Sequence, residues 1–566
     1  MKALAEFTHE RRVGYFSMEI ALRPDIPTYS GGLGVLAGDT LRSATDLELP
    51  LVAVTLVSRA GYFRQEIDGA GNQIEHPDNW EPADHALPLD AKIAIEIGGR
   101  TVWITGWLYI IHGHMNGQQP VILLDAFLPE NHPEDRELTH FLYGGDAQYR
   151  FKQEIILGIG GIRLLHALGF EINKYHMNEG HSALLGLELL NRYSYSSEEL
   201  RPGESPFDIP RVRELCCFTT HTPVEAGHDR FSYEMVSKLL GDFIPEAVMK
   251  RLAGDELFNL TRLALNLSEY INGVAKSHAD ISRHLFPGYK VRAITNGVHP
   301  HTWACPEMTA LFDRYIPGWC HEPEQLIRVE CCIPDDELTA AHLGAKKKLQ
   351  ELVEKNGGPQ IRLEQPILGF ARRMTAYKRP DLLFSDLERL RQIAARTPFQ
   401  VVMSGKAHPR DEGGKALIKV LHQMSRALEG QITVVFLPDY DMQTAQVLVS
   451  GVDIWLNTPL RPMEASGTSG MKAALNLVPN LSVLDGWWIE GCIEGITGWA
   501  VGNHELSAEE SDASSLYRKL ENTVLPLFYN EPAAWLSVMK NAVSKNASIF
   551  NSHRMMRRYA TEAYIP

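Results

Sequence analysis

The chain has 566 residues, of which 44% are hydrophobic and 22% are charged, values that are ordinary for a soluble globular enzyme. Its length predicts about two to four domains with large hydrophobic cores. The formal net charge of −15 argues against nonspecific binding to nucleic acids or to membrane surfaces. It does not exclude a small anionic ligand. Because salt screens charges over about 8 Å at physiological ionic strength, the charges close to a site determine whether it binds an anion.

The sequence shows neither a membrane span nor a secretion signal. No run of about eighteen uncharged apolar residues occurs, and residues 1–16 lack the apolar core of a signal peptide. We therefore expect a cytoplasmic protein. The seven cysteines include two adjacent pairs but no C-x-x-C spacing, which favours reduced thiols over disulfides or a zinc site.

The first half of the chain mixes strand-like and helix-like segments. Residues 11–22 and 49–63 are typical of buried strands, and residues 93–110 with 120–127 predict antiparallel hairpins. Two helix-like segments follow at residues 149–169 and 181–193. One more buried strand, within residues 214–223, ends in a polar turn.

The second half repeats one unit: a short apolar run, a polar or glycine-rich corner, and a helix-like segment. Such alternation indicates a parallel sheet buried on both faces, in which ligands bind beyond the carboxyl ends of the strands. An N-G turn and two prolines near residue 300 mark a boundary. We therefore predict two α/β domains, residues 1–298 and 299–545, that face each other across a cleft. The repeated units lie at residues 366–380, 400–417, 432–451 and 453–475.

Residues 464–476, EASGTSGMKAALN, place small hydrogen-bonding residues ahead of a lysine. The run from Ser466 to Gly470 can fold tightly around an anion through backbone N–H groups and hydroxyls. The good helix formers that follow would put this anion at a helix N-terminus. Lys472 would then project from the first turn, either as a counter-charge or as an amine that binds a ligand covalently.

A basic cluster follows another strand of the second half. Arg372, Arg373, Lys378 and Arg379 lie directly after the apolar run ILGF. A charge run alone is more often a solvated surface. This one lies at a strand's carboxyl end, where anions bind, and arginine can recognise phosphate through two parallel hydrogen bonds. Lys406 occupies the equivalent corner of the next unit.

Two further motifs are ambiguous on their own. The glycines of YSGGLGVLAGDTL, residues 29–41, offer N–H groups to a phosphate or to sugar hydroxyls, or form a tight turn without a ligand. The segments MNEGHSALL and FTTHTPVEAGHDRF contain histidines, but no spacing matches a standard metal motif, so we predict no catalytic metal. His221 follows a buried strand, which favours a position in the cleft.

Together, the motifs resemble those of one enzyme family. EASGTSGMKAALN is similar to the pyridoxal-phosphate signature of the α-glucan (glycogen, starch, maltodextrin) phosphorylases. YSGGLGVLAGDTL, GYFRQEIDGAGNQIE, FTTHTPVEAGHDRF, RAITNGVHPHTW and FARRMTAYKRP also resemble family segments in the family's order, over about residues 13–490. The resemblance implies an α/β glycosyltransferase-B fold, with the active site between two Rossmann-like domains. It also implies that the last helix, within residues 546–566, crosses back to the N-terminal domain.

The resemblance assigns the cofactor site residue by residue. Lys472 matches the lysine that binds pyridoxal phosphate covalently. Thr468, Lys378, Gly31 and Gly32 match positions around the cofactor phosphate and the substrate phosphate.

The remaining matches concern the substrates. Arg373 matches the arginine that grips orthophosphate, with Arg372 as its basic neighbour, and His221 matches the histidine beside the sugar. Asp146 matches an aspartate of the mobile loop that gates the active site. The positions that match groups binding the hydroxyls of the transferred glucose are Glu464, Ser466, Gly467 and Asn296.

The implied reaction is reversible phosphorolysis of the non-reducing end of an α-1,4-glucan, giving α-glucose 1-phosphate with retention of configuration. A phosphate group with a pKa of about 6 can give and take a proton near neutrality. Arg373 and Lys378 would offset the repulsion between the two phosphates. The implied partners are a glucan and orthophosphate, and a homodimer is expected from the resemblance.

Two alternatives stay open at this point. A glycogen-synthase-like transferase would use a nucleotide sugar on the same fold, and a catalytically silent glucan-binding protein would keep the fold without the reaction. A pyridoxal aminotransferase is disfavoured, since no aspartate for the ring nitrogen is identifiable.

The sequence also departs from the family. Its signature reads Ser469-Gly470 where the family has glycine and asparagine, which leaves one hydrogen bond unaccounted for. We find no counterpart of the N-terminal regulatory extension and therefore expect no control by phosphorylation or AMP there.

Overall fold

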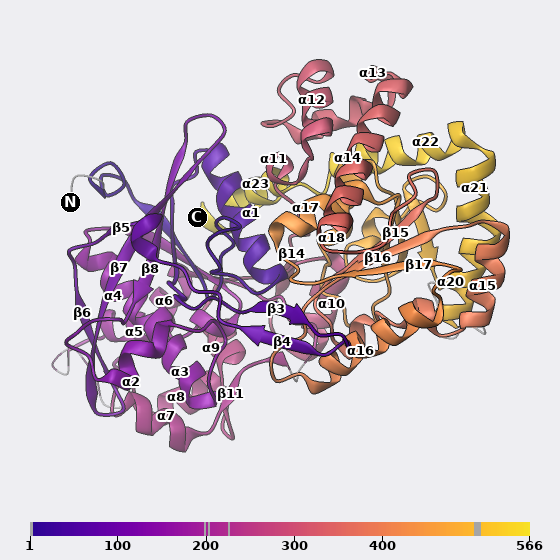
Figure 1. Ribbon diagram of the computed structural model, residues 1–566. Helices are drawn as coiled ribbons and strands as arrows, with labels where there is room; N and C mark the ends of the chain where they lie inside the picture. The colour runs from indigo at the N-terminus through magenta and orange to yellow at the C-terminus, as the bar shows by residue number, and fades with distance from the viewer. Residues whose placement is uncertain are drawn as a thin grey trace.

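The computed structural model describes residues 4–196, 198, 200–201, 204–224, 227–502 and 511–565. Within these residues the chain forms two large sheets, one from each half, with helices packed on them (Figure 1). This mixed α/β architecture with parallel strands agrees with the prediction from the alternating sequence pattern.

The N-terminal sheet has ten strands in the order β14-β13-β10-β9-β1-β2-β8-β7-β5, with β6 paired to β7. Neighbours from β14 to β8 run parallel, whereas β5, β6 and β7 pair antiparallel, as the hairpin pattern predicts. Every residue of β1 and β2 is buried, because helices cover both faces at the centre of a parallel sheet. The strands are β1 (Arg12–Ser17), β2 (Leu51–Leu56), β5 (Leu87–Pro88), β6 (Ile93–Ile97), β7 (Arg100–His112), β8 (Gln118–Asp125), β9 (Ile172–Asn178), β10 (Cys216–Thr219), β13 (Tyr270–Gly273) and β14 (Val291–Ala293).

The C-terminal sheet has six strands, all parallel, in the order β17-β16-β15-β18-β19-β20. It arises from the repeated unit of the second half, and β15 and β16 are buried throughout. Its strands are β15 (Ile367–Ala371), β16 (Gln400–Ser404), β17 (Thr433–Leu437), β18 (Ile454–Asn457), β19 (Asn480–Val483) and β20 (Gly498–Val501). Two small hairpins lie outside the sheets: β3 (Arg64–Ile67) with β4 (Gln73–His76), and β11 (Arg230–Phe231) with β12 (Phe258–Asn259).

Many helices begin where a short polar side chain can cap them. Asp146, Asp411 and Asp441, for example, each accept a hydrogen bond from a first-turn N–H group. The helix predicted over residues 149–169 is interrupted by a π turn at Ile156–Gly160. Helices of the first half are α1 (Gly32–Asp46), α2 (Pro133–Arg136), α3 (Ala147–Ile155), α4 (Gly161–Ala167), α5 (Leu185–Arg192), α6 (Ile209–Leu215), α7 (Tyr233–Leu240), α8 (Glu246–Ala253), α9 (Leu260–Asn266) and α10 (Lys276–Leu285).

Helices of the second half fill the space around the C-terminal sheet. Among all the helices described, none combines the length and the apolar character that crossing a lipid bilayer requires. The helices of this half are α11 (Pro300–Trp303), α12 (Pro306–Tyr315), α13 (Val329–Cys332), α14 (Asp335–Lys355), α15 (Leu387–Arg396), α16 (Glu412–Ala427), α17 (Met442–Gly451), α18 (Ser469–Leu475), α19 (Trp488–Gly491), α20 (Asp512–Lys519), α21 (Leu525–Asn530), α22 (Pro532–Asn541) and α23 (Ser552–Tyr559).

The end of the chain packs against the half in which the chain begins (Figure 1). Met556, Tyr559 and Tyr564 belong to one buried cluster with residues of β1, β2 and α1. Asn272 Nδ2, at the end of β13, donates a hydrogen bond to Tyr559 Oη at 2.9 Å. These contacts fasten the C-terminal segment to the N-terminal sheet.

A buried cluster of Asp46, His299 and His553 joins three distant segments at this junction. The N–H group of Thr302 donates to His299 Nδ1 at 3.2 Å, so the ring proton is on Nε2, which donates to Asp46 at 2.8 Å. His553 Nε2 lies 3.6 Å from the same carboxylate oxygen. The hydrogen bond between His299 and Asp46 is therefore the closest contact of this cluster.

The hairpin of β3 and β4 forms an arm that reaches from the first half onto the second (Figure 1). Gln65 Nε2 donates to the carbonyl of Gly405 at 3.0 Å, and Gln73 Nε2 donates to the carbonyl of Ala407 at 2.9 Å. The N–H group of Ala407 donates back to Gln73 Oε1 at 3.0 Å. Since both glutamines are buried, the arm ties the halves through hydrogen bonds that water does not compete for.

Gln73→Ala should weaken this arm. The substitution leaves the N–H and carbonyl groups of Ala407 without partners, which should cost about 1–3 kcal/mol of unfolding free energy. Gln118→Ala, at an exposed position of β8, is the matched control and should change the free energy by less than about 0.5 kcal/mol. Urea denaturation measures both, and equal stability of the two variants would contradict the role given to the arm.

Candidate active site

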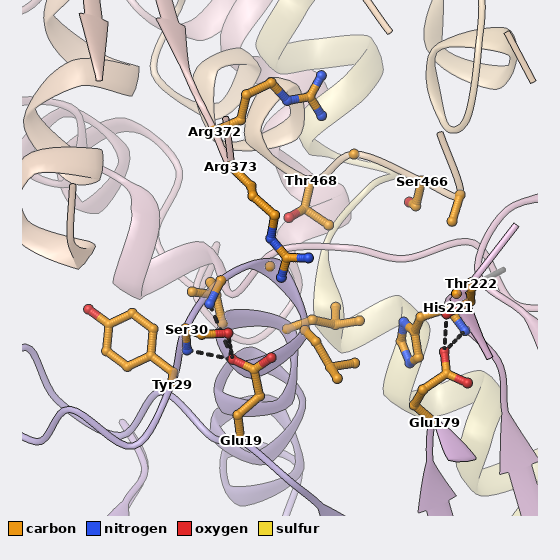
Figure 2. A pocket seen from close by; sticks show the side chains of 18 of the residues that line it. Glu19, Tyr29, Ser30, Glu179, His221, Thr222, Arg372, Arg373, Ser466 and Thr468 are labelled. Atoms are coloured by element: carbon orange, nitrogen blue, oxygen red, sulfur yellow. Dashed lines mark hydrogen bonds between the residues drawn. The ribbon is translucent and has the colours of Figure 1, made fainter. Parts of the chain in front are cut away.

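A cavity of about 570 Å³ lies between the carboxyl ends of the two sheets (Figure 2). Its walls come from residues that follow β1, β9, β10 and β14 on one side and β15 to β18 on the other. This is the position in which open parallel sheets bind their ligands. Of the thirteen site residues predicted from the sequence, all but Asp146 line the cavity: Gly31, Gly32, His221, Asn296, Arg372, Arg373, Lys378, Glu464, Ser466, Gly467, Thr468 and Lys472.

A buried ion cluster forms the C-terminal wall. Arg372 Nη2 lies 2.7 Å from Glu464 Oε2, and the ammonium of Lys378 contacts the same oxygen. Burial alone would favour the neutral acid, but the two cations outweigh it and lower the pKa of Glu464 to about 2. Glu464 is therefore a carboxylate at all physiological pH values. It is the acidic partner of the basic cluster predicted after β15.

Several buried polar atoms of the cavity lack a partner among the described residues. They include Nε and Nη1 of Arg372, Oγ of Ser466 and Oδ1 of Asn296. Buried polar groups are nearly always hydrogen-bonded in native proteins. Because these donors and acceptors belong to residues of one cavity, they fit a ligand rich in hydroxyl or phosphate oxygens.

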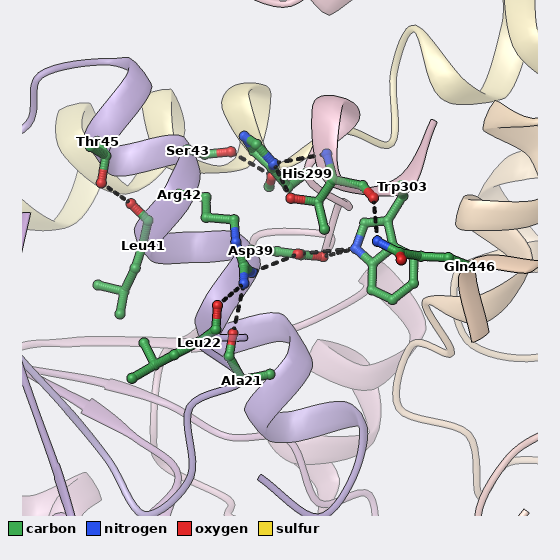
Figure 3. Close-up of polar contacts among 12 residues, drawn as sticks. Ala21, Leu22, Asp39, Leu41, Arg42, Ser43, Thr45, His299, Trp303 and Gln446 are labelled. Atoms are coloured by element: carbon green, nitrogen blue, oxygen red, sulfur yellow. Dashed lines mark hydrogen bonds and ion pairs between the residues drawn. The ribbon is translucent and has the colours of Figure 1, made fainter. Parts of the chain in front are cut away.

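Lys472 lies on α18, where its amine is buried beside an aromatic ring. Its Nζ is 3.6 Å from the centre of the Trp303 ring, and Trp303 Nε1 donates to Asp39 at 2.8 Å (Figure 3). Burial lowers the pKa of Lys472 to about 8, and the nearby charge of Asp39 offsets only part of the effect. About a tenth of the amine is therefore unprotonated at pH 7, far more than for an ordinary lysine, and this is the form in which an amine acts as a nucleophile.

The unusual Ser469-Gly470 pair has a packing explanation. Asn480 Nδ2, on β19, donates to the carbonyl of Gly470 at 3.0 Å. A Cβ atom on Gly470 would lie 2.2 Å from Asn480 Oδ1, so a side chain at position 470 fits only if Asn480 moves. Trp455 Nε1 donates to Ser469 Oγ at 3.2 Å. The amide of Asn480 thus occupies space that a side chain at position 470 would need. Sequence reasoning missed this contact because the two positions lie on different elements.

His221 is held as a neutral imidazole at the edge of the N-terminal sheet. Burial lowers its pKa to about 3, and the charges of nearby histidines lower it further. Its Nε2 lies 2.7 Å from Asn178 Oδ1, so this nitrogen carries the proton and donates it. His221 is therefore oriented by the last residue of β9.

Glu179 is a cavity residue that the sequence analysis did not assign. It adopts a φ of 71°, which is uncommon for a residue with a side chain. Its carboxylate accepts from the N–H group of His221 at 2.7 Å and from the hydroxyl of Thr222 at 3.0 Å. Burial raises the pKa of Glu179 to about 7. The signal that could have found it is the one used for His221, a polar residue directly after a buried strand.

Asp146 is not part of the cavity lining. It caps the N-terminus of α3, where its carboxylate accepts from the N–H group of Tyr149 at 2.8 Å. Tyr143, three residues earlier, does line the cavity. The gating role inferred for Asp146 therefore stays a prediction, and the loop that precedes it reaches the site through Tyr143.

Gly470→Asn, which restores the residue usual in the resembled family, should destabilise this protein. Its side chain would clash with Asn480, and overpacking of this kind costs about 1–3 kcal/mol. The double substitution Gly470→Asn/Asn480→Ala makes room for the new amide and should recover most of the loss. Thermal unfolding of the two variants tests this account, which fails if the single variant is as stable as the parent.

Comparisons with known proteins agree with this geometry. Residues 229–496 match the family model described as carbohydrate phosphorylase. The chain is 40% identical to a maltodextrin phosphorylase of Thermococcus litoralis, over 98% of this chain and 70% of the relative. It is 33% identical to a glycogen phosphorylase of Aquifex aeolicus (99% and 87% covered) and 35% identical to one of Mycobacterium tuberculosis (98% and 71%). The resemblance read from the motifs is thus confirmed, and the chain belongs to the carbohydrate phosphorylase family.

Proposed function

We propose that this protein is an α-1,4-glucan phosphorylase, which transfers the glucose at the non-reducing end of a glucan to orthophosphate and gives α-glucose 1-phosphate with retention. One observation carries the proposal: a single cavity combines a cationic corner, polar groups that have no partner among the described residues and suit hydroxyls, and a buried amine. The printed names of the relatives, maltodextrin phosphorylase and glycogen phosphorylase, support it. Maltodextrin, glycogen and starch are the candidate glucans.

We also propose that the fold is of the glycosyltransferase-B type, with Rossmann-like domains at residues 1–298 and 299–545 and a returning segment at 546–566. The two mainly parallel sheets with a cavity between their carboxyl ends support this division. The contacts of α23 with α1 support the return of the last segment to the N-terminal domain.

The cavity fits pyridoxal phosphate bound covalently to Lys472. The amine is buried, has a pKa of about 8 and contacts the ring of Trp303 without a hydrogen bond to any described residue, so it is available for attachment. We propose that Thr468, Lys378 and the turn of Gly31 and Gly32 surround the cofactor phosphate and the substrate phosphate. All four residues line the same cavity as Lys472.

When bound, pyridoxal phosphate would supply a phosphate group that gives and accepts a proton near neutral pH. Arg373 and Lys378 would hold orthophosphate beside it, because cations offset the repulsion between two anions.

The remaining cavity residues would bind the sugar. The carboxylate of Glu464 would accept hydrogen bonds from hydroxyls of the transferred glucose, to which Ser466, Gly467 and Asn296 would contribute further contacts. The neutral ring of His221 would lie beside the sugar. A cavity that holds glucose and phosphate while excluding water favours phosphorolysis over hydrolysis.

Lys472→Ala should lose both the covalent cofactor and phosphorolysis. Borohydride reduction followed by peptide mapping should tag Lys472 in the parent and leave the variant unlabelled. Phosphate-dependent release of glucose 1-phosphate from maltoheptaose and from glycogen measures the activity. Lys419→Ala, an exposed position on α16, is the control and should keep both properties.

A Lys472→Ala variant that performs phosphorolysis at the parental rate without cofactor would refute the proposal. Glucosyl transfer from a nucleotide sugar, with no phosphorolysis by the parent, would instead support the glycogen-synthase-like alternative. A parent that binds glucan but catalyses neither reaction would support the silent binding protein.

Covalent attachment of the cofactor should follow the titration of Lys472. Only the unprotonated amine attacks a carbonyl, so the rate should rise about tenfold per pH unit below pH 8 and level off above it. For an unperturbed lysine the rise would continue to about pH 10.4. The rate of absorbance change on adding pyridoxal phosphate to the apoprotein measures this. A plateau only above pH 10 would show that burial does not lower the pKa.

A further inference from the structure

The glycine-rich turn before α1 already binds a carboxylate of the protein. Glu19 Oε2 accepts hydrogen bonds from the N–H group of Ser30 at 2.6 Å, from Ser30 Oγ at 3.1 Å and from the N–H group of Gly31 at 3.2 Å (Figure 2). Glu19 follows β1 and is 1% exposed. The first two N–H groups of the turn are therefore used by Glu19, and both Gly31 and Gly32 line the cavity.

The other oxygen of the same carboxylate reaches a second loop. Tyr143 Oη donates to Glu19 Oε1 at 3.0 Å. Burial, and then the charge of Glu19, raise the pKa of Tyr143, so the hydroxyl keeps its proton and acts as the donor. Tyr143 has a φ of 55° and lies three residues before Asp146, in the loop that leads into α3. One carboxylate thus bridges the glycine turn and this loop.

The bridge lies next to the proposed phosphate-binding arginine. A Cβ atom on Gly31 would be 3.6 Å from Arg373 Nη2, and Figure 2 shows the guanidinium of Arg373 pointing toward the turn that carries Ser30. A negative charge at this place repels phosphate, so Glu19 does not serve to attract the substrate. Its hydrogen bonds from Ser30 and Gly31 instead fix the backbone that faces Arg373.

We propose that Glu19 is a positioning residue for orthophosphate, which couples the Tyr143 loop to the glycine turn so that both take their substrate-binding conformation together. This inference rests on the proposed function. Glu19 acts through the N–H groups of the turn and through its placement beside Arg373. The hydroxyl of Tyr143 acts through Glu19, while the rest of the Tyr143 side chain lines the cavity.

A double-mutant cycle tests the coupling, with the Michaelis constants for phosphate and for maltoheptaose and kcat as readouts. Glu19→Ala should raise the phosphate KM about 10- to 100-fold, the effect of losing hydrogen bonds to a charged group, and should change the glucan KM much less. Tyr143→Phe should raise the phosphate KM about 3- to 10-fold, since it removes one such bond. The double variant should equal Glu19→Ala, because a residue that acts through another adds nothing once that other is gone.

Two further variants keep the test decisive. Glu19→Gln removes the charge and keeps an acceptor, so its phosphate KM should lie between those of the parent and Glu19→Ala. If Glu19→Ala does not fold, the same cycle is run with Glu19→Gln and Tyr143→Phe. Glu137→Ala, an exposed glutamate in the segment before this loop, is the matched control and should leave all three constants unchanged.

Three results would overturn the inference: an unchanged phosphate KM in Glu19→Ala, a lower one in Glu19→Gln, or additive effects in the double variant. Calorimetric titration of the holoenzyme with inorganic phosphate, without glucan, separates this inference from the proposed function. A parent that binds no phosphate and has no activity would refute the proposed function. A parent and a Glu19→Ala variant that bind phosphate equally would refute only the role of Glu19.

Discussion

The site depends on keeping several positive charges inside the protein. A buried cation is costly unless a partner or a ligand compensates it. Arg372 and Lys378 share Glu464, Lys406 pairs with Asp439 at 2.7 Å, and the amine of Lys472 rests on an aromatic ring. This compensation explains how a chain with a net charge of −15 can offer a local site for anions. The acidic residues of the wall lower the free-energy cost of burying the cationic ones in the absence of substrate.

The need to compensate buried positive charges also explains why the site lies between the two halves of the chain. Neither sheet alone encloses the basic corner, and the cavity exists because the carboxyl ends of both sheets close over it. The arm of β3 and β4 and the returning α23 hold this arrangement together. Side chains that never touch the cavity, such as Gln73 and Tyr559, thereby set the distance between groups that do.

Much of this could be predicted from the sequence, because the pattern that reveals parallel strands also locates their ends. Arg372, Arg373, Lys378 and Lys472 follow recognisable strands and proved to line one cavity. What the sequence could not reveal are contacts between elements far apart in the chain. Glu19 lies in a strand-like run with no sign of the turn it binds. The partners of Asn480, Gln65 and Gln73 depend on packing that no local pattern encodes.

The contact between Gly470 and Asn480 bears on how the sequence of such a motif can change. A side chain at position 470 and the amide of Asn480 would need the same space, so in this protein the signature has to be read together with position 480. Replacing Gly470 by asparagine before Asn480 is shortened would create a clash, whereas shortening Asn480 first would leave a cavity. A search pattern for this signature should therefore treat positions 470 and 480 jointly.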